Sequence, residues 1–324
     1  MLLEVRHVTR YQYAASVRES VMELWMQPQR SPGQRLISFE LEIEPTAQVF
    51  SYADSFGNAV YHFDVPQPHD QLEIVAYSAV ETQPLEPLPD ALDQGEWNRL
   101  RADFVQGDCF EFLRPHGFAG WNEALAAFAR ERGWEDLRRL DPLSAARALT
   151  AAIYDAFEYE QGVTEADSPI EHALEEGSGV CQDFAHIMIA ICRHWGLPAR
   201  YVSGYLFTDR AEDHYRSDPD ATHAWVEVFL PSLRWVGFDP TNNIPAGDRH
   251  VAVAVGRDYG DVPPSRGVYK GEADSQLAVG VSVRRARAAL SDPEFLRLPK
   301  PSPSGLRRRP QPGTTAQQQQ QQQQ

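Results

Sequence analysis

The amino-acid sequence predicts an α+β protein, in which an N-terminal antiparallel β domain precedes a core of helices packed on an antiparallel sheet. Three observations support this fold class. Residues 1–82 contain segments in which apolar and polar residues alternate, residues 122–196 carry helix signals, and strand-like segments return after residue 199. Because helices and strands form separate runs along the chain, α+β is favoured over a doubly wound α/β fold.

The N-terminal β domain is expected over residues 1–82, and residues 83–99 are expected to be a linker. Residues 54–58, DSFGN, form a turn signal inside the third candidate strand. The linker holds three prolines and few large apolar residues. The β domain holds no cluster of reactive side chains, so we interpret it as a scaffold or a substrate-orienting module. Its candidate strands are LEVRHVTRYQY, ISFELEIEP, VFSYADSFGNAVYHFDV and LEIVAYSAVET.

The core is expected over residues 100–283. Asn122 before EALAAFARER and Asp141 before a proline are N-cap signals, and proline suits the first position of a helix. A further helix is expected over residues 181–196, because a glycine ends its pattern and a proline follows. The strands expected after it are ARYVSGYLF, HAWVEVFL, RWVGFDP, HVAVAVGRD and LAVGVSV.

Charge and hydropathy limit the classes of partner. The formal net charge is −16, but residues 284–309 carry eight Lys/Arg against two acids, so the rest of the chain carries −22. An acidic body argues against nucleic acid as the main partner, and the lack of a long apolar run predicts no membrane span. Charged residues at positions 4 and 6 do not suit a signal peptide, which predicts a cytoplasmic location. Residues 284–324, basic and ending in eight glutamines, are expected to be disordered.

Three cysteines, Cys109, Cys181 and Cys192, are too few and too far apart to predict a disulfide framework or a zinc site. No EF-hand pattern, phosphate loop or dinucleotide fingerprint is present, so neither a metal nor a cofactor is predicted. Cys109 and Cys192 are expected to be buried core residues. Cys181 differs, because it stands at the expected start of a helix, where the dipole and the unsatisfied amides favour a thiolate.

The helix phase places Cys181 on an apolar face that must pack against other structure. The polar residues of this helix, His186 among them, fall on the opposite side. His186 is therefore a poor base for Cys181, and we expect it to pack at the surface or to bond a neighbouring loop.

A nucleophilic thiol needs a base and a residue that orients the base. His223 begins the segment HAWVEVFL, and Asp239 ends RWVGFDP, which follows after a short connection. If the two segments are antiparallel neighbours, Asp239 can bind one imidazole nitrogen and leave the other facing the thiol. Taken singly, a histidine at a strand start or an aspartate before proline is more often structural, so this pattern alone is only suggestive.

The segment GVCQDFAHIMIAICRHWGLPARYVSGYL, followed by THAWVEVFLPSLRWVGFDPTNN, closely resembles the transglutaminase-like family of bacteria, whose core fold is related to papain-type cysteine peptidases. The resemblance extends over residues 1–283 and includes the N-terminal domain that often precedes this core. It implies a papain-like core in which Cys181 is the nucleophile, His223 the general base and then acid, and Asp239 the residue that orients His223.

The implied reaction is acyl transfer on a peptide or carboxamide bond of a peptide or protein substrate, through a thioester. Hydrolysis is the preferred interpretation; a protein-glutamine transglutaminase and a non-catalytic peptide-binding module are the alternatives. The Cys181 amide is one candidate oxyanion donor, and Gln182 or a tyrosine of the segment YVSGY is a second. Residues 208–220 are interpreted as a lid or as a solvated connection. The sequence leaves the oligomeric state open.

Overall fold

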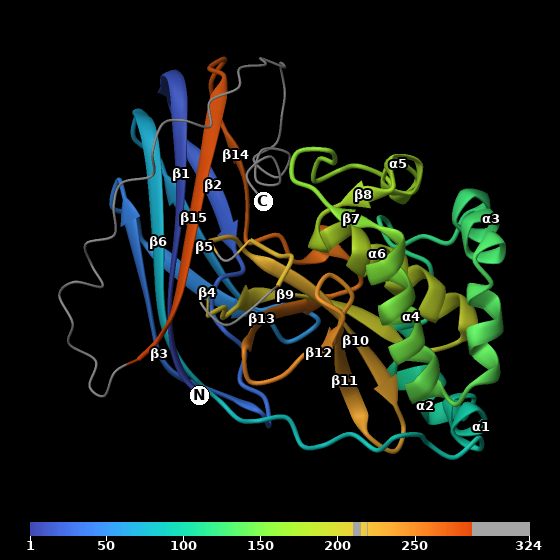
Figure 1. The fold of residues 1–324 in the computed structure, drawn as a ribbon. Coiled ribbons are helices and arrows are strands. Elements are labelled where there is room, and N and C mark those ends of the chain that lie inside the picture. Colours follow the sequence, from blue (N-terminus) through green and yellow to red (C-terminus); the bar gives the residue numbers. More distant parts are fainter. Residues whose placement is uncertain (210–214, 219, 287–324) are drawn as a thin grey trace.

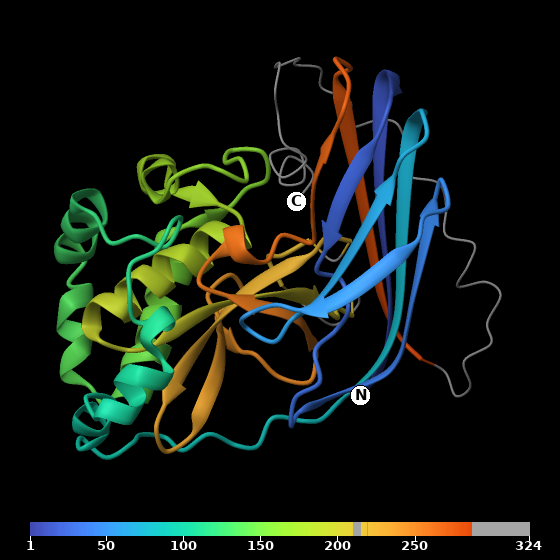
Figure 2. The same ribbon diagram turned by 180° about the vertical axis from the view of Figure 1, so that it is seen from behind.

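The structure, a computed structural model, describes residues 1–209, 215–218 and 220–286. Most of the tail predicted to be disordered, residues 287–324, lies outside this range, so that prediction stays a prediction. The architecture is α+β, as the sequence predicts. Figure 1 shows long strands on one side, a central sheet, and helices on the far side of that sheet; Figure 2 shows the same arrangement from behind.

The N-terminal region forms two four-stranded antiparallel sheets with the strand orders β15-β1-β6-β3 and β14-β2-β5-β4. Both sheets contribute to one buried apolar cluster, to which β1 gives Tyr11, β5 gives Phe63 and β6 gives Leu72. The two sheets therefore form a sandwich around a shared core. The strands of this region are β1 (Leu2–Val17), β2 (Ser20–Leu24), β3 (Gln34–Glu44), β4 (Val49–Ala53), β5 (Ala59–Val65) and β6 (His69–Thr82).

The last two strands of the described chain, β14 (Ser265–Tyr269) and β15 (Ser275–Arg285), belong to this sandwich. β15 pairs with β1 from Leu3 opposite Arg285 onward, and β14 pairs with β2. The division at residues 82 and 283 therefore differs from the structure, because the chain returns to the N-terminal sheets after the core. Alternation in a sequence identifies a strand, but it does not identify the strand's partner.

The helices begin where the capping signals predict. The Asn122 side chain accepts from the Leu125 amide, and Asp141 accepts from the amides of Leu143 and Ser144. The first helix starts within the predicted linker, at Glu96. The helices are α1 (Glu96–Leu100), α2 (Asp103–Asp108), η1 (Phe110–Phe112), α3 (Glu123–Glu131), η2 (Trp134–Arg139), α4 (Pro142–Ala156), α5 (Ile170–Glu176), α6 (Cys181–Trp195) and η3 (Tyr259–Asp261). Among the described residues, none of these helices is long and apolar enough to cross a membrane.

The central sheet is antiparallel and has the strand order β12-β11-β10-β9-β13. Helix α6 packs on β9 and β10, and α4 packs on α6, β10 and β11. The helices and the sandwich lie on opposite sides of this sheet (Figure 1). Its strands are β9 (Ala199–Leu206), β10 (His223–Leu230), β11 (Arg234–Asp239), β12 (Ile244–Pro245) and β13 (His250–Gly256), and β7 (Glu158–Tyr159) with β8 (Ser178–Gly179) forms a separate parallel pair.

Polar side chains from the sandwich fix strand β13. The Asn58 amide group donates to the Val255 carbonyl and accepts from the Val255 amide, each at 2.8 Å. The Gln34 side chain makes the same pair of bonds with Ala252, also at 2.8 Å. Each amide group thus satisfies a donor and an acceptor of an edge strand. The sandwich is therefore joined to the strand of the central sheet that begins at His250.

Candidate active site

Cys181 is the first residue of α6, as the sequence predicts, and its side chain is buried. The preceding turn is held by Asp183, whose Oδ2 accepts from the Val180 amide at 2.9 Å and from the Thr164 hydroxyl at 2.7 Å. A Cβ added at Gly179 would lie 2.7 Å from that oxygen, so only glycine fits there without a shift. The glycine before the nucleophile and the aspartate after it together shape the helix start.

The opposite side of α6 is buried, which corrects the expectation that His186 packs at the surface. Its Nε2 accepts from the Tyr259 amide at 3.2 Å, and its ring stacks on Phe118. Arg193, on the same side, donates to the carbonyls of Phe112, Ala199 and Arg257. Backbone groups of other segments supply the acceptors and donors that let these polar groups be buried, which periodicity alone does not reveal. His186 bonds the first residue of η3 and does not serve Cys181.

His223 begins β10, and its ring is buried. Its Nε2 lies 2.8 Å from Oδ2 of Asp239, while Nδ1 is buried without a hydrogen-bond partner among the described residues. Because a carboxylate only accepts, the Nε2 atom carries the proton and donates it. Burial lowers the pKa of His223, but the Asp239 carboxylate and the neighbouring Cys181 side chain outweigh burial and raise the pKa to about 10.

Asp239 ends β11 and is completely buried. Its Oδ1 accepts from the amides of Thr241 and Asn242 at 3.0 and 3.2 Å. Its Oδ2 accepts from His223, from the Asn242 side chain at 2.8 Å and from Nε2 of His250 at 3.2 Å. Burial raises the pKa of this carboxyl, but the two histidines outweigh burial, so the pKa is lowered and the group is ionised.

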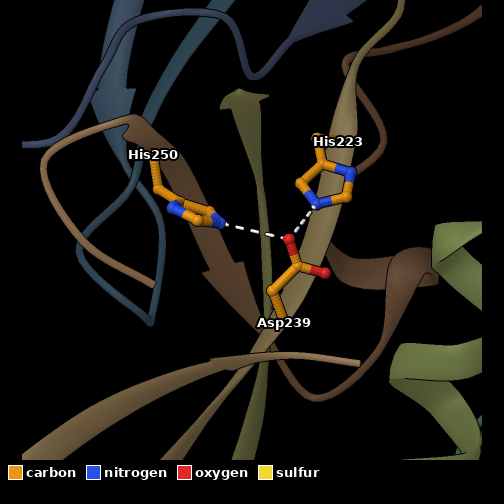
Figure 3. Close-up of side chains that lie close together, drawn as sticks. All are labelled: His223, Asp239 and His250. Atoms are coloured by element: carbon orange, nitrogen blue, oxygen red, sulfur yellow. Dashed lines mark hydrogen bonds and ion pairs between the residues drawn. The ribbon is translucent and has the colours of Figure 1, made fainter. Parts of the chain in front are cut away.

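The structure therefore joins His223 to Asp239, leaves Cys181 within electrostatic reach of His223, and adds two residues that sequence reasoning missed. His250 approaches Asp239 from β13 and reaches the same carboxylate oxygen as His223 (Figure 3). Asn242 lies in the turn after Asp239. The sequence shows a histidine at the start of a predicted strand and an asparagine three residues after an aspartate. Neither position in the sequence predicts a contact with the Asp239 carboxylate.

Asn242 also joins the site to the segment that the sequence interprets as a lid or connection. Its side-chain oxygen accepts from the Arg216 amide at 2.9 Å, and its nitrogen donates to the Ser217 hydroxyl at 3.1 Å. The Arg216 guanidinium lies 3.4 Å from the centre of the Tyr154 ring and donates to the carbonyls of Tyr154 and Phe157. Residues 215–218 are therefore anchored to the site; residues 210–214 and 219 of this segment lie outside the described residues.

Two phenols lie within electrostatic reach of Cys181. Burial and then Cys181 raise the pKa of both Tyr159 and Tyr201. The Tyr205 hydroxyl is engaged elsewhere, 2.9 Å from Nδ1 of His7 in the sandwich. The Gln182 amide nitrogen donates to the Ala166 carbonyl at 3.2 Å, which turns that donor away from the thiol. Of the second donors named from the sequence, Gln182 and Tyr205 are therefore engaged elsewhere, and Tyr201 lies within electrostatic reach of the thiol.

His223, Asp239 and His250 offer three ligand atoms within 4.8 Å of one another, so we tested whether they fit a metal ion. The Gly247 amide donates to Nδ1 of His250 at 3.2 Å. That bond places the His250 proton on Nε2, the atom that a shared metal would need. The three residues therefore do not fit a metal and fit a carboxylate that accepts two N–H bonds.

A second group, His116, Asp258 and Asp261, has a similar spread. Here Asp258 accepts from Nδ1 of His116 at 2.8 Å and from the Phe118 amide at 3.1 Å, and Asp261 accepts from the Arg257 guanidinium. These bonds join loops, and we interpret this cluster as structural.

Comparisons with known proteins agree with the fold. Residues 3–81 match the bacterial transglutaminase-like N-terminal region, and residues 135–240 match the transglutaminase-like superfamily. An uncharacterized protein of Mycobacterium leprae is 32% identical over 283 residues, which cover 87% of this chain and 98% of that protein. A protein-glutamine gamma-glutamyltransferase of Pseudomonas aeruginosa is 31% identical over 107 residues, covering 30% of this chain and 16% of that protein.

A solved structure described as a "putative cysteine protease" from Cytophaga hutchinsonii superposes with a TM-score of 0.68. The superposition covers 90% of this chain and 92% of that chain, at 23% sequence identity. At this level of identity the likeness shows the fold alone. It covers the sandwich as well as the core, so the two parts occur together in that protein too.

Proposed function

The chain belongs to the transglutaminase-like superfamily, and from this premise we propose that it is a thiol-dependent enzyme that transfers acyl groups from peptide or carboxamide bonds. The observation that carries the proposal is the environment of His223. One ring nitrogen is bonded to a buried carboxylate. The other is buried with no hydrogen-bond partner in the described part of the chain, and the Cys181 side chain acts on the same ring. A thiol, an imidazole and a carboxylate in this order are what a cysteine nucleophile requires.

In the proposed reaction, the Cys181 thiol gives its proton to Nδ1 of His223, and the thiolate sulfur attacks the substrate carbonyl carbon. The resulting oxyanion accepts hydrogen bonds at the start of α6, where backbone amides lack helical acceptors. The C–N bond then breaks as the His223 imidazolium gives its proton to the departing nitrogen. This leaves a thioester on Cys181 and a free amine or ammonia.

The second half of the reaction releases the acyl group. A water molecule gives its proton to Nδ1 of His223 and attacks the thioester carbon, and the Cys181 sulfur departs and regains a proton. We propose hydrolysis of a peptide or protein substrate as the main activity, in the cytoplasm as the sequence predicts. The alternative is transfer of the acyl group to a primary amine. One observation supports it: the similarity to the Pseudomonas protein-glutamine gamma-glutamyltransferase over 107 residues. Acceptor choice depends on groove shape and on water access.

The experiment that tests this proposal uses a library of glutamine-containing peptides, with and without an added primary amine. Mass spectrometry then distinguishes three products: cleaved peptide, deamidated glutamine and amine-modified glutamine. Hydrolytic products that persist in the presence of the amine support the main proposal, and amine incorporation supports the alternative. The Cys181→Ala variant is the control.

The second alternative, a peptide-binding module without catalysis, is tested by the rate at which iodoacetamide alkylates Cys181 at a mildly acid pH. If Cys181 reacts no faster at this pH than a free thiol, the enzyme proposal fails.

A further inference from the structure

We propose that His250 is a positioning residue of this site: it holds the Asp239 carboxylate through the same oxygen that binds His223 and thereby keeps the His223 ring directed at Cys181. The inference rests on the proposed function and adds a residue to it. It is carried by the hydrogen bonds of the described residues, in which one carboxylate oxygen accepts from both histidines (Figure 3).

The first step concerns the protonation of His250. The Gly247 amide donates to Nδ1 at 3.2 Å, so that nitrogen is an acceptor and carries no proton. The remaining proton is on Nε2, which donates to Oδ2 of Asp239 at 3.2 Å. His250 is therefore a neutral donor of defined orientation. Burial lowers the pKa of His250 and agrees with this assignment, although Asp239 acts in the opposite direction.

The second step concerns how rigidly His250 is held. It is the first residue of β13, and two amide side chains of the sandwich, Asn58 and Gln34, bind the backbone of this strand. The Trp225 ring lies edge-on to His250, with centroids 5.0 Å apart, and is stacked with His223 at 6.1 Å. Both histidines thus pack on one indole, and the sandwich contributes indirectly to the geometry of the site.

The third step concerns charge. The ionisable groups that face His223 are Asp239 from β11, Cys181 from α6 and His250 from β13, and those that face His250 are Asp239, His223 and Asp248. Each neutral donor to the Asp239 oxygen draws some of its negative charge away from His223. Removal of the His250 donor leaves more of that charge for the His223 imidazolium. The imidazolium should then persist to a higher pH, and the less restrained carboxylate should orient the ring less well.

The test is the pH dependence of Cys181 alkylation by iodoacetamide, a neutral probe, measured from about pH 4 to about pH 12 by mass spectrometry of the modified peptide. The alkaline step of this profile reports loss of the His223 proton. Circular dichroism at each pH shows that the protein is folded, because an unfolded chain would add the ionisation step of a free thiol.

For His250→Leu, we expect the alkaline step to move upward by about half to one pH unit, the size that one hydrogen bond allows. His250→Gln, which keeps an amide donor at a similar distance, should return the step to the parent position. The matched control is His116→Leu, which removes a histidine from the buried Asp258 carboxylate and should leave the profile unchanged.

An unchanged or lowered alkaline step in His250→Leu would overturn the inference, as would a shift that His250→Gln does not reverse. Failure of the proposed function has a different signature, because the parent protein itself would then show no enhanced Cys181 reactivity at low pH. The two failures are therefore distinguishable in one series of measurements.

Discussion

Nε2 of His223 lies 2.8 Å from Oδ2 of Asp239, and both side chains are buried, with exposed fractions of 2% and 0%. A buried charge pair of this kind is costly unless each partner has further hydrogen bonds. Asp239 has them, from two backbone amides and from the side chains of Asn242 and His250. The pair therefore has the supporting bonds that a reactive imidazole requires, and the following predictions depend on it.

Replacement of Cys181 by alanine should abolish turnover, with a loss of at least about a thousandfold, because no other group supplies the nucleophile. The fold should persist, since alanine suits the first turn of a helix. The matched control is Cys192→Ala, a fully buried core cysteine of the same helix, which should keep activity but lose about 1–2 kcal/mol of stability. Turnover and thermal unfolding are the two measurements. A Cys181→Ala protein as active as the parent would reject the mechanism.

Replacement of Asp239 by asparagine should move the alkaline step of Cys181 alkylation downward, the direction opposite to that expected for His250→Leu. The carboxylate charge that raises the pKa of His223 to about 10 is lost, while the burial that lowers this pKa remains. The fraction of Cys181 that is present as thiolate near neutral pH should fall as the pKa of His223 falls. Activity should drop less than in His223→Ala, which removes the proton carrier itself. An upward shift would show that Asp239 does not act on His223 through charge.

Replacement of Gly179 by alanine should impair the site without touching a catalytic side chain. The new Cβ would lie 2.7 Å from the Asp183 carboxylate oxygen, which must then give up its bonds to Val180 and Thr164. We expect a loss of about 1–3 kcal/mol of stability and slower Cys181 alkylation. Gly280→Ala is the control, because a Cβ there meets nothing within 4 Å. Equal stability of the two variants in urea would contradict the role assigned to Asp183.

The folded protein should lose stability as the pH is lowered from about 6.5 toward 4. Burial lowers the pKa of His7 to about 4 and that of His186 to about 3, so the unfolded chain takes up protons that the folded chain does not. The loss should approach about 1.4 kcal/mol per pH unit for each histidine. His223 has the opposite pH dependence, because its pKa is raised in the folded protein. Its contribution to stability is lost only as the pH rises from about 6.5 toward 10.

Urea unfolding at several pH values measures this dependence. In His7→Asn, which keeps an acceptor toward Tyr205 but does not titrate, the acid slope should become shallower. The same slope in the variant and the parent would show that His7 is not the group responsible.

A chain that ends at residue 286 should fold and keep activity, whereas a chain that ends at residue 264 should not fold. The longer chain keeps every described strand, and the shorter one loses β14 and β15 and leaves β1 and β2 with exposed edges. Circular dichroism and size-exclusion chromatography measure the outcome. A soluble, cooperative fold for the shorter chain would contradict the role of these strands.

The local features of this protein were predictable from sequence, and the long-range ones were not. Asp141 before a proline identifies a helix start because capping is a matter of adjacent residues, and the helix at Cys181 follows from the same reasoning. The pairing of β15 with β1 could not be predicted, because alternation does not identify a partner. The resemblance to a known family indicated Cys181, His223 and Asp239 together; the structure joins His223 to Asp239, and the triad remains a proposal.

The buried polar residues were harder to predict for the same reason. His186 has a polar side chain on what a helical wheel shows as the outer face, yet η3, more than seventy residues later, covers it. His250 bonds Asp239 from a different strand and carries no local sign of that contact. Both depend on tertiary contacts that a window of sequence does not contain.

The pairing of β1 with β15 has a consequence for synthesis on the ribosome. Strand β1 leaves the exit tunnel long before β15, so one of its edges stays uncovered until β15 has emerged. The sandwich, and through Asn58 and Gln34 the strand that begins at His250, can therefore reach its final form only after β15 has been translated. A nascent chain that stops short of β15 should be inert toward its substrate.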